Sequence, residues 1–188
     1  CESLQVPFFL YEKDVEQIAR REGISTEEAG RNIRYEAFRE VLTKCASAES
    51  KATEGEIKET GTLSRNVGGH LKIAVAHHKN DRAETVLFHL FRGTGPVGLE
   101  GIRPTREDKD GIEVIRPLLD ASRTEIEAYL KELQVGWCED ATNGEDDYCR
   151  NRIRHNILPY AEDEICRSAV AHMNQTAENL RLAEIYLG

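Results

Sequence analysis

The sequence lacks the features of an exported or membrane-spanning protein. No run approaches the roughly 20 apolar residues that a membrane helix requires, and no basic-plus-apolar signal opens the chain. Paired cysteines are also missing: the five cysteines are odd in number and show no C-x-x-C spacing, which argues against a zinc site or a redox pair. Free thiols in a reducing cytoplasm are therefore expected for Cys1, Cys45, Cys138, Cys149 and Cys166.

Positive charge is scarce as well. The sequence has 25 Lys and Arg residues but 34 Asp and Glu residues, so its net charge is −9. This balance argues against a protein that coats nucleic acid through bulk electrostatics. A local basic stripe can still bind RNA, because salt confines such contacts to about 10 Å. With 39% apolar and 31% charged residues, the composition is that of a globular domain.

Short apolar runs alternate with segments of helical periodicity. The apolar runs predict strands at residues 6–11, 71–76, 114–115 and 135–138. The helical spacing predicts helices at 14–22, 25–44, 81–92, 122–133, 151–159 and 165–187. Residues 46–69 are polar and aperiodic, which indicates an exposed insertion. This alternation predicts an α/β fold with a parallel sheet covered by helices on both faces.

The segment after the predicted strand 71–76 is the first place to look for chemistry, since ligands bind beyond the carboxyl ends of parallel strands. His77 and His78 follow that strand, and Asp81 and Glu84 lie three residues apart on the next helix. The two carboxylates suit Mg²⁺ or a substrate ammonium group. The alternative is that Asp81 caps the helix with Glu84 as its capping-box partner. Two histidines without a third close ligand make a weak zinc site, and the absence of an adjacent His-Asp pair disfavours an HD-type phosphohydrolase.

Several segments resemble, in order, the motifs of the tRNA(Ile)-lysidine synthetases of the PP-loop ATPase superfamily. Residues 76–102 (AHHKNDRAETVLFHLFRGTGPVGLEGI) are similar to AHHxDDQxET…RGxGxxGLxGM, and residues 115–126 are similar to RPLLxxxRxEI. Residues 139–143 and 148–155 (EDATN and YCRNRIRH) resemble EDxTN…YxRNRIRH, and residues 27–35 resemble EExARxxRY. The resemblance covers the chain apart from the insertion at 46–69. It implies a Rossmann-like fold of the adenine nucleotide alpha hydrolase type.

The resemblance implies a cytoplasmic ligase that uses ATP and Mg²⁺. Such an enzyme adenylates the C2 oxygen of the wobble cytidine in tRNA(Ile) with a CAU anticodon, and the ε-amine of L-lysine then displaces AMP. The chemistry needs cations that face phosphates, a carboxylate that receives lysine, and a metal that neutralises the leaving group. A homodimer is compatible with this assignment.

The same resemblance implies the residues of the site. The candidates for catalysis are Asp81, which is also the candidate Mg²⁺ ligand, Glu84 and Arg34. Nucleotide contacts are assigned to Ala76, His77, Arg31, Gly93 and Gly95, and contacts with tRNA or lysine to Arg92, Arg116, Arg150, Asn151 and Arg154.

Other roles stay open for most of these residues. Arg31 and Arg34 also fit a solvated helix face, and the glycines, including Gly98, also fit a structural turn. Arg92 and Arg116 also fit a role in capping carbonyl groups. Arg150 and Asn151 also fit a clamp to the loop through Asp140 and Asn143.

Two departures from the family pattern modify these expectations. The SGGxDS loop, whose backbone N–H groups cradle pyrophosphate, does not occur in the sequence, and Asn80 replaces an acidic residue. We interpret Cys1 as a cut edge, with residues 1–160 forming a partial catalytic domain and residues 161–188 leading to a tRNA-binding region. We expect the chain alone to bind ATP poorly. The alternative function is a non-catalytic domain that binds RNA or a partner, whereas tRNA thiolation enzymes are disfavoured because they use paired cysteines.

Overall fold

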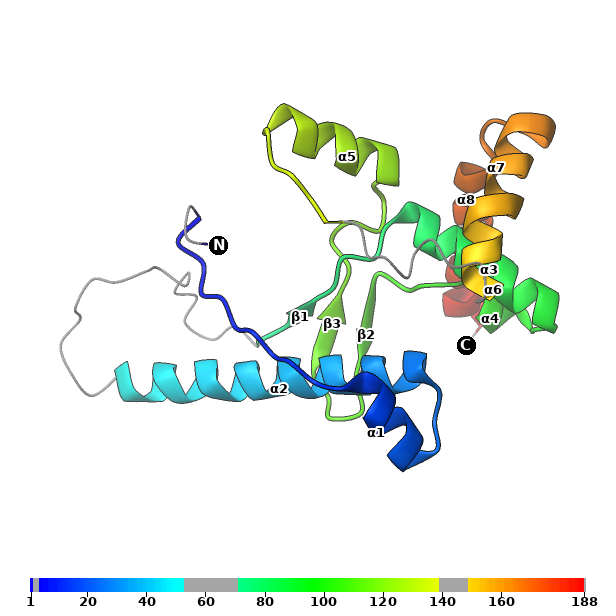
Figure 1. The fold of residues 1–188 in the computed structure, drawn as a ribbon. Helices are drawn as coiled ribbons and strands as arrows, with labels where there is room; N and C mark the ends of the chain where they lie inside the picture. Colours follow the sequence, from blue (N-terminus) through cyan, green and yellow to red (C-terminus); the bar gives the residue numbers. More distant parts are fainter. Residues whose placement is uncertain (2–3, 53–70, 139–148, 188) are drawn as a thin grey trace. The chain divides into compact units, whose positions relative to one another are not determined.

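The computed structural model describes residues 1, 4–52, 71–138 and 149–187 (Figure 1). It contains two compact units, residues 1–71 and 72–188. Within the described ranges, no helix has the length and apolar character needed to cross a membrane. None of the five cysteines forms a disulfide. Residues 53–70 of the predicted insertion, and Asp140 and Asn143 of the predicted clamp, lie outside the described residues.

The first unit contains helices α1 (Val15–Glu22) and α2 (Thr26–Ala52). Asp14 caps α1 by accepting a hydrogen bond from the Gln17 amide at 2.9 Å, and Gly23 ends the helix in the left-handed conformation at φ +67°. The predicted strand at 6–11 is wrong, because these residues belong to no strand and 6–10 are exposed. An apolar run becomes a strand only where a neighbouring strand supplies hydrogen bonds.

The second unit contains a three-stranded sheet in the order β1-β3-β2 (Figure 1). Strand β1 (Ile73–Ala74) pairs in parallel with β3 (Glu113–Ile115), with Ile73 opposite Val114. This confirms the α/β class. Strand β2 (Thr105–Glu107) pairs antiparallel with β3, so the sheet is mixed. The sequence did not indicate β2, since its three residues, Thr-Arg-Glu, carry no apolar run.

The helices of the second unit are α3 (Lys79–Arg92), α4 (Pro96–Leu99), α5 (Arg123–Glu132), α6 (Cys149–Arg152), α7 (Leu158–Tyr160) and α8 (Ala169–Leu187), with π-helical turns η3 (Ile153–Ile157) and η4 (Ala161–Ile165). The predicted helix at 151–159 is confirmed as the continuous run of α6, η3 and α7. The predicted helix at 165–187 begins later, at Ala169, because Cys166 is extended at φ −158°. The predicted strand at 135–138 is wrong: these residues are exposed and unpaired in any sheet.

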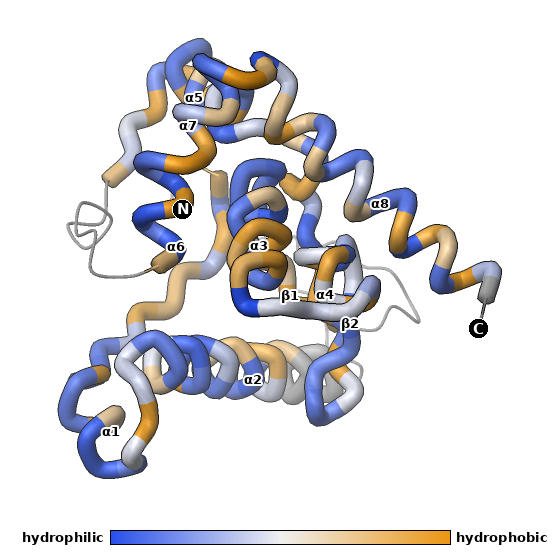
Figure 2. The backbone as a smooth tube through the Cα atoms, turned by 90° about the vertical axis from the view of Figure 1, so that its right-hand side faces the viewer, coloured by the Kyte–Doolittle hydropathy of each residue, from blue (hydrophilic) through white to orange (hydrophobic). Residues whose placement is uncertain are grey.

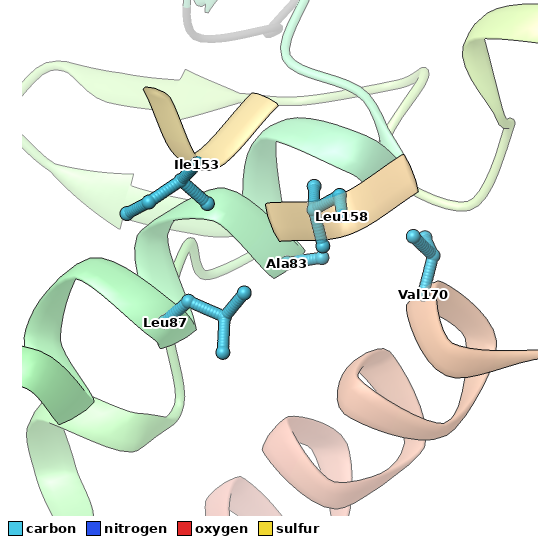
Figure 3. Packing of buried hydrophobic residues seen from close by; sticks show 5 residues of the cluster. All are labelled: Ala83, Leu87, Ile153, Leu158 and Val170. Atoms are coloured by element: carbon cyan, nitrogen blue, oxygen red, sulfur yellow. The ribbon is translucent and has the colours of Figure 1, made fainter. Parts of the chain in front are cut away.

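The core of this unit forms around α3. Ala83 and Leu87 of α3 pack with Ile153, Leu158 and Val170 (Figure 3). In Figure 2, hydrophobic residues gather in the second half of α3. Polar contacts add to this packing, because Asn174 of α8 donates a hydrogen bond to the Lys79 carbonyl at 3.0 Å. Helix α3 is therefore held by segments that lie more than 60 residues further along the chain.

Candidate functional site

The start of α3 lies just after β1, where the sequence analysis expects a ligand. His78 is the N-cap: its Nδ1 accepts a hydrogen bond from the Asp81 amide at 3.4 Å, and the Asp81 carboxylate accepts one from the His78 amide at 2.9 Å. The alternative in which Asp81 is the N-cap and Glu84 its partner is therefore wrong. Histidine is an uncommon N-cap residue, whereas aspartate is a favourable one. The residue types therefore favoured Asp81, which lies three residues after the N-cap that the structure shows.

Glu84 has a partner 70 residues away in sequence. Arg154 donates to both of its carboxylate oxygens, through Nε at 2.7 Å and Nη2 at 3.0 Å. The same Nη2 lies 3.3 Å from Oδ1 of Asp81. The Glu84 residue is 3% exposed, and the hydrogen bond to this carboxylate raises the pKa of Arg154. One guanidinium therefore neutralises both predicted catalytic carboxylates in a bidentate, largely dry contact.

The basic cluster of residues 150–155 is thus divided between two environments. Arg154 turns towards α3 and is half-buried, whereas Arg150 and Arg152 are exposed. Contact between Arg154 and tRNA stays a prediction, as does the role of Asn151, which is half-buried in α6.

His77 contacts a second predicted site residue, Arg116. The Nε of Arg116 donates to Nδ1 of His77 at 3.2 Å, while its Nη1 donates to the Arg103 carbonyl at 2.5 Å. Burial lowers the pKa of His77 and the nearby Arg116 charge lowers it further, whereas the Asp81 carboxylate acts to raise it; the net effect is a lowered pKa. His77 is therefore held as neutral imidazole with Nδ1 as the acceptor, which leaves Nε2 as a hydrogen-bond donor. Ala76, beside it, is exposed.

Asn80 joins α3 to the segment that resembles RPLLxxxRxEI. Its side-chain oxygen accepts a hydrogen bond from the Arg123 amide at 3.1 Å, and the Lys79 amide donates to the Ala121 carbonyl at 2.9 Å. Ser122 caps α5, the helix predicted at 122–133, and Glu125 completes a capping box with it. The amide at position 80 thus has a structural task that the sequence comparison did not reveal.

The glycine-rich segment after α3 folds back onto that helix. Gly93 ends α3 at φ +75°, and Gly95 precedes α4 with ordinary backbone angles. At Gly101, φ is +65° and a Cβ atom would lie 2.9 Å from Cγ2 of Val86. Gly101 is therefore required by a close approach to α3. Nucleotide contacts of Gly93 and Gly95 stay predictions.

Phe88 is a contact residue that the sequence analysis missed. The Cζ atoms of Arg92 and Arg150 lie 5.0 and 5.7 Å from the centroid of its ring. Both arginines are exposed. The only advance signal is the four-residue spacing of Phe88 and Arg92, which places them on one side of α3.

Arg31 and Arg34 lie on α2, in the unit of residues 1–71, and both are exposed. Arg31 lies over the ring of Tyr35, with its Cζ 5.9 Å from the centroid. His77 and Asp81 belong to the other unit, and the catalytic role of Arg34 and the nucleotide-binding role of Arg31 stay predictions.

The described residues do not assemble a metal site of their own. No group of three or more His, Cys, Asp or Glu side chains suited to a metal occurs among them. The carboxylates of Asp81 and Glu84 are already bound to Arg154. Magnesium normally takes several oxygen ligands in an octahedral arrangement, so the residues as they stand do not fit this ion.

Comparison with known proteins identifies the family. Residues 62–161 match the PP-loop domain, a range that includes the whole of α3 and Arg154. The chain is 40% identical over 187 residues to the tRNA(Ile)-lysidine synthase of Caldanaerobacter subterraneus subsp. tengcongensis, covering 100% of this chain and 34% of that protein. The corresponding values for the Clostridium acetobutylicum tRNA(Ile)-lysidine synthase are 37% over 187 residues, 100% and 35%.

A third relative, the tRNA(Ile)-lysidine synthase of Solibacter usitatus, is 44% identical over 115 residues, which are 61% of this chain and 25% of that protein. The chain spans about a third of the length of the first two of these curated relatives. The similarity to them extends along the whole sequence, and the family match includes the contacts around α3. The chain therefore belongs to the PP-loop domain family.

Proposed function

We propose that this chain is part of a tRNA-modifying ligase that joins L-lysine to C2 of the wobble cytidine in tRNA(Ile) with a CAU anticodon. The observation that carries the proposal is the meeting of three motif segments around α3. Residues 76–85 supply His77 and the two carboxylates, residues 115–123 supply Arg116, and residues 149–155 supply Arg154. These segments resemble the tRNA(Ile)-lysidine synthases, whose names state the product.

The proposed reaction has two steps. The cytidine C2 oxygen attacks the α-phosphate of ATP and pyrophosphate leaves; the ε-amine of lysine then attacks C2, and AMP leaves with the C2 oxygen. The residues of the site suit this sequence. In this proposal the Nε2–H of neutral His77 donates to a phosphate oxygen, and Arg116, which donates a hydrogen bond to its Nδ1, supplies a positive charge.

Asp81 and Glu84 are the proposed receptor for the lysine ammonium group. Their present partner, Arg154, is itself a cation, which supports the view that this pair of carboxylates selects positive charge. A lysine amine that binds here shares the carboxylates with Arg154 or displaces it. As they stand these carboxylates are occupied by Arg154 and do not fit Mg²⁺; we propose Asp81 as the residue that would contact the ion if Arg154 moved away from it.

The remaining assignments extend this proposal to the other elements. Gly93 and Gly95 are assigned to the nucleotide, as are Ala76 and Arg31, and Arg34 is assigned to catalysis. Asn151 is assigned to the tRNA, together with the arginines at 92 and 150. We also propose a cytoplasmic location, and the assignment is compatible with a homodimer.

A second candidate function is a non-catalytic domain that binds RNA. The specific observation in its favour is that Arg154 neutralises both candidate catalytic carboxylates, and that Asn80 is used to join α3 to α5. A protein that only binds RNA would retain these contacts as fold-stabilising interactions.

The two candidates are separated by incubating the full gene product with ATP, labelled lysine and tRNA(Ile) carrying a CAU anticodon. The ligase incorporates label and releases one AMP and one pyrophosphate for each lysine, and a tRNA with a different anticodon stays unlabelled. Asp81→Asn and Glu84→Gln are expected to abolish incorporation, whereas Arg20→Gln, a change at an exposed helix position, leaves it intact. Binding of tRNA without incorporation, under conditions in which the protein is folded, would establish the non-catalytic candidate.

A further inference from the structure

Arg103 makes a set of contacts that the proposed chemistry does not use. It lies on the short segment that joins α4 to β2 (Figure 1). Its Nε donates to the Glu100 carboxylate at 2.7 Å, and its Nη2 donates to the carboxylate of Glu184, on α8, at 2.8 Å. Its backbone carbonyl accepts the hydrogen bond from Nη1 of Arg116. One residue therefore connects α8 to an arginine of the candidate site.

Glu100 anchors this guanidinium to the interior of the unit. The residue is 1% exposed, and its backbone carbonyl accepts a hydrogen bond at 3.3 Å from Nε of Arg82, a buried residue of α3. Burial acts to raise the pKa of Glu100, but hydrogen bonds with Glu184 and Arg103 outweigh burial and lower the pKa. The carboxylate is therefore held in its ionised form beside α3, where it binds Arg103.

The guanidinium contacts fix the backbone of residue 103, where no regular structure does so. Residues 100–104 lie between α4 and β2 and belong to neither. Pro104 confines Arg103 to extended backbone conformations, because the proline ring crowds the residue before it. The carboxylates of Glu100 and Glu184 hold the side chain in one place, which limits the movement of the carbonyl group.

Arg116 is bound to the same segment at two points. Its backbone amide donates to the Pro104 carbonyl at 2.9 Å, just after the end of β3. Its guanidinium donates through Nη1 to the Arg103 carbonyl and through Nε to Nδ1 of His77. Because a guanidinium is planar and rigid, a shift of the oxygen that binds Nη1 also turns Nε. The hydrogen bond on Nδ1 in turn decides which ring nitrogen of His77 carries the proton.

We propose that Arg103 is a positioning residue for His77. Held by Glu100 and Glu184, it fixes the guanidinium of Arg116, which keeps the imidazole in its Nε2–H form. The proposal rests on the proposed function for the use of this N–H toward a phosphate, whereas the positioning is a property of the contacts themselves. Arg103 touches no substrate and acts only through Arg116.

The test determines the tautomer of His77 by nitrogen NMR of the full gene product, isotope-labelled at histidine, at a pH where the ring is neutral. The chemical shifts of Nδ1 and Nε2 distinguish the protonated nitrogen from the unprotonated one, and His77→Asn assigns the signals by removing them. The variants are Arg103→Met and Arg116→Met, alone and combined. Arg123→Met is the matched control, because its side chain is 48% exposed, against 47% for Arg103, and also binds a carboxylate at 2.7 Å.

Arg103→Met is expected to move the ring-nitrogen signals of His77 in the same direction as Arg116→Met, by about half of that change or more, because Nδ1 loses its fixed donor. The combined variant is expected to match Arg116→Met alone, since Arg103 acts only through Arg116. Arg123→Met keeps the parental signals. Parental signals in Arg103→Met, or changes that add in the combined variant, would overturn the proposal.

A further variant separates lost positioning from lost stability. Arg103→Met leaves the Glu100 carboxylate buried without this cation, so the substitution is also made together with Glu100→Gln, which removes the buried charge. Thermal unfolding is measured first, and the spectra are recorded well below the unfolding temperature of each variant. The His77 signals of this pair are expected to differ from the parental signals as those of Arg103→Met do, and parental signals in the pair count against the proposal.

Lysine incorporation by the same preparations measures the proposed function. Arg103→Met is expected to lower its rate about tenfold, because the Nε2–H of His77 is no longer held in place. Changed His77 signals without incorporation by the parent leave the positioning role in place and remove the ligase assignment. Incorporation by the parent, with parental His77 signals in Arg103→Met, leaves the function in place and removes the positioning role.

Discussion

The guanidinium of Arg154 donates two hydrogen bonds, of 2.7 and 3.0 Å, to the carboxylate of Glu84, a residue 70 positions earlier in the sequence. This ion pair fastens the π-helical turn η3 to α3 beside the hydrophobic contacts of Ile153. It is also the link between the fold and the candidate chemistry, since the same guanidinium contacts Asp81. A contact that stabilises the core thus sets the position and charge of the candidate catalytic groups.

Replacing Arg154 with Met is expected to lower the free energy of unfolding by about 2–3 kcal/mol, because Glu84 is then left as a buried, unpaired carboxylate. Urea unfolding measures the change. The matched control is Lys72→Met, which removes the exposed ion pair with Glu113 in the same unit and is expected to cost less than about 1 kcal/mol. Adding Glu84→Gln to Arg154→Met should recover part of the loss, because it removes the buried charge. Equal losses of stability in Arg154→Met and Lys72→Met would contradict the role given to the Arg154–Glu84 pair.

The neutral state of His77 depends in part on its neighbour Arg116. Removing that charge with Arg116→Met is expected to raise the pKa of His77 towards its ordinary value of 6.5, although burial still keeps it lower. NMR titration of the imidazole gives the pKa directly. Because folding depresses this pKa, the stability contributed by neutral His77 is present above about pH 6.5 and is lost as the pH falls. An unchanged or lower pKa in the variant would show that Arg116 does not act on this ring.

The low pKa of Glu178 leads us to expect an acid-sensitive contact between α8 and α3. Hydrogen bonds from Arg181 and then Arg82 lower the pKa of its carboxyl to about 2, against burial, which acts to raise it. The folded state therefore favours the ionised form, and the stabilisation is present above about pH 4.5 and disappears as the pH falls towards 2. Thermal unfolding between pH 6 and pH 2.5 should show a smaller acid-induced drop for Glu178→Gln than for the parent. Parallel curves for the two proteins would refute this linkage.

Two glycines with positive φ provide a matched comparison of backbone strain and packing. At Gly101 a Cβ atom would lie 2.9 Å from Val86, whereas at Gly111, where φ is +78°, nothing lies within 4 Å. Gly101→Ala is therefore expected to cost about 2–4 kcal/mol from strain plus overpacking, and Gly111→Ala about 1 kcal/mol from strain alone. The free energy of unfolding of each variant, measured in urea, tests the difference. Similar losses would mean that Val86 moves aside without cost.

The parts of the fold that the sequence predicted are those with a local cause. The helices predicted at 122–133 and 81–92 depend on residues within one or two turns, and both occur in the structure, where Ser122 and Glu125 form a capping box and Gly93 ends α3. The apolar segments 6–11 and 135–138 were expected to form strands and do not. Strand formation requires a partner elsewhere in the chain, and composition does not report whether that partner is present.

In the candidate site, too, local features were predicted from the sequence and distant partners were not. The spacing of Asp81 and Glu84 placed both carboxylates on one side of a helix, and the structure places them within reach of one guanidinium. Their partner could not be identified from spacing, because Arg154 lies 70 residues from Glu84 and was expected to face RNA. Likewise, one of the two interpretations of Asp81 made it the N-cap of α3 because aspartate is a favourable residue type there, whereas His78 is the cap in the structure.

Helix α3, which carries these groups, also fixes the distances between them along its axis. The N-cap His78 is followed at successive turns of α3 by Asp81, Glu84, Phe88 and Arg92. A helix advances about 1.5 Å for each residue. The backbone positions of Asp81 and Glu84 are therefore held about 16 and about 12 Å from that of Arg92 along the axis. A ligand that contacts both Asp81 and Arg92 must bridge this separation, and a deletion of one residue within α3 would turn its far end by about 100° relative to its start.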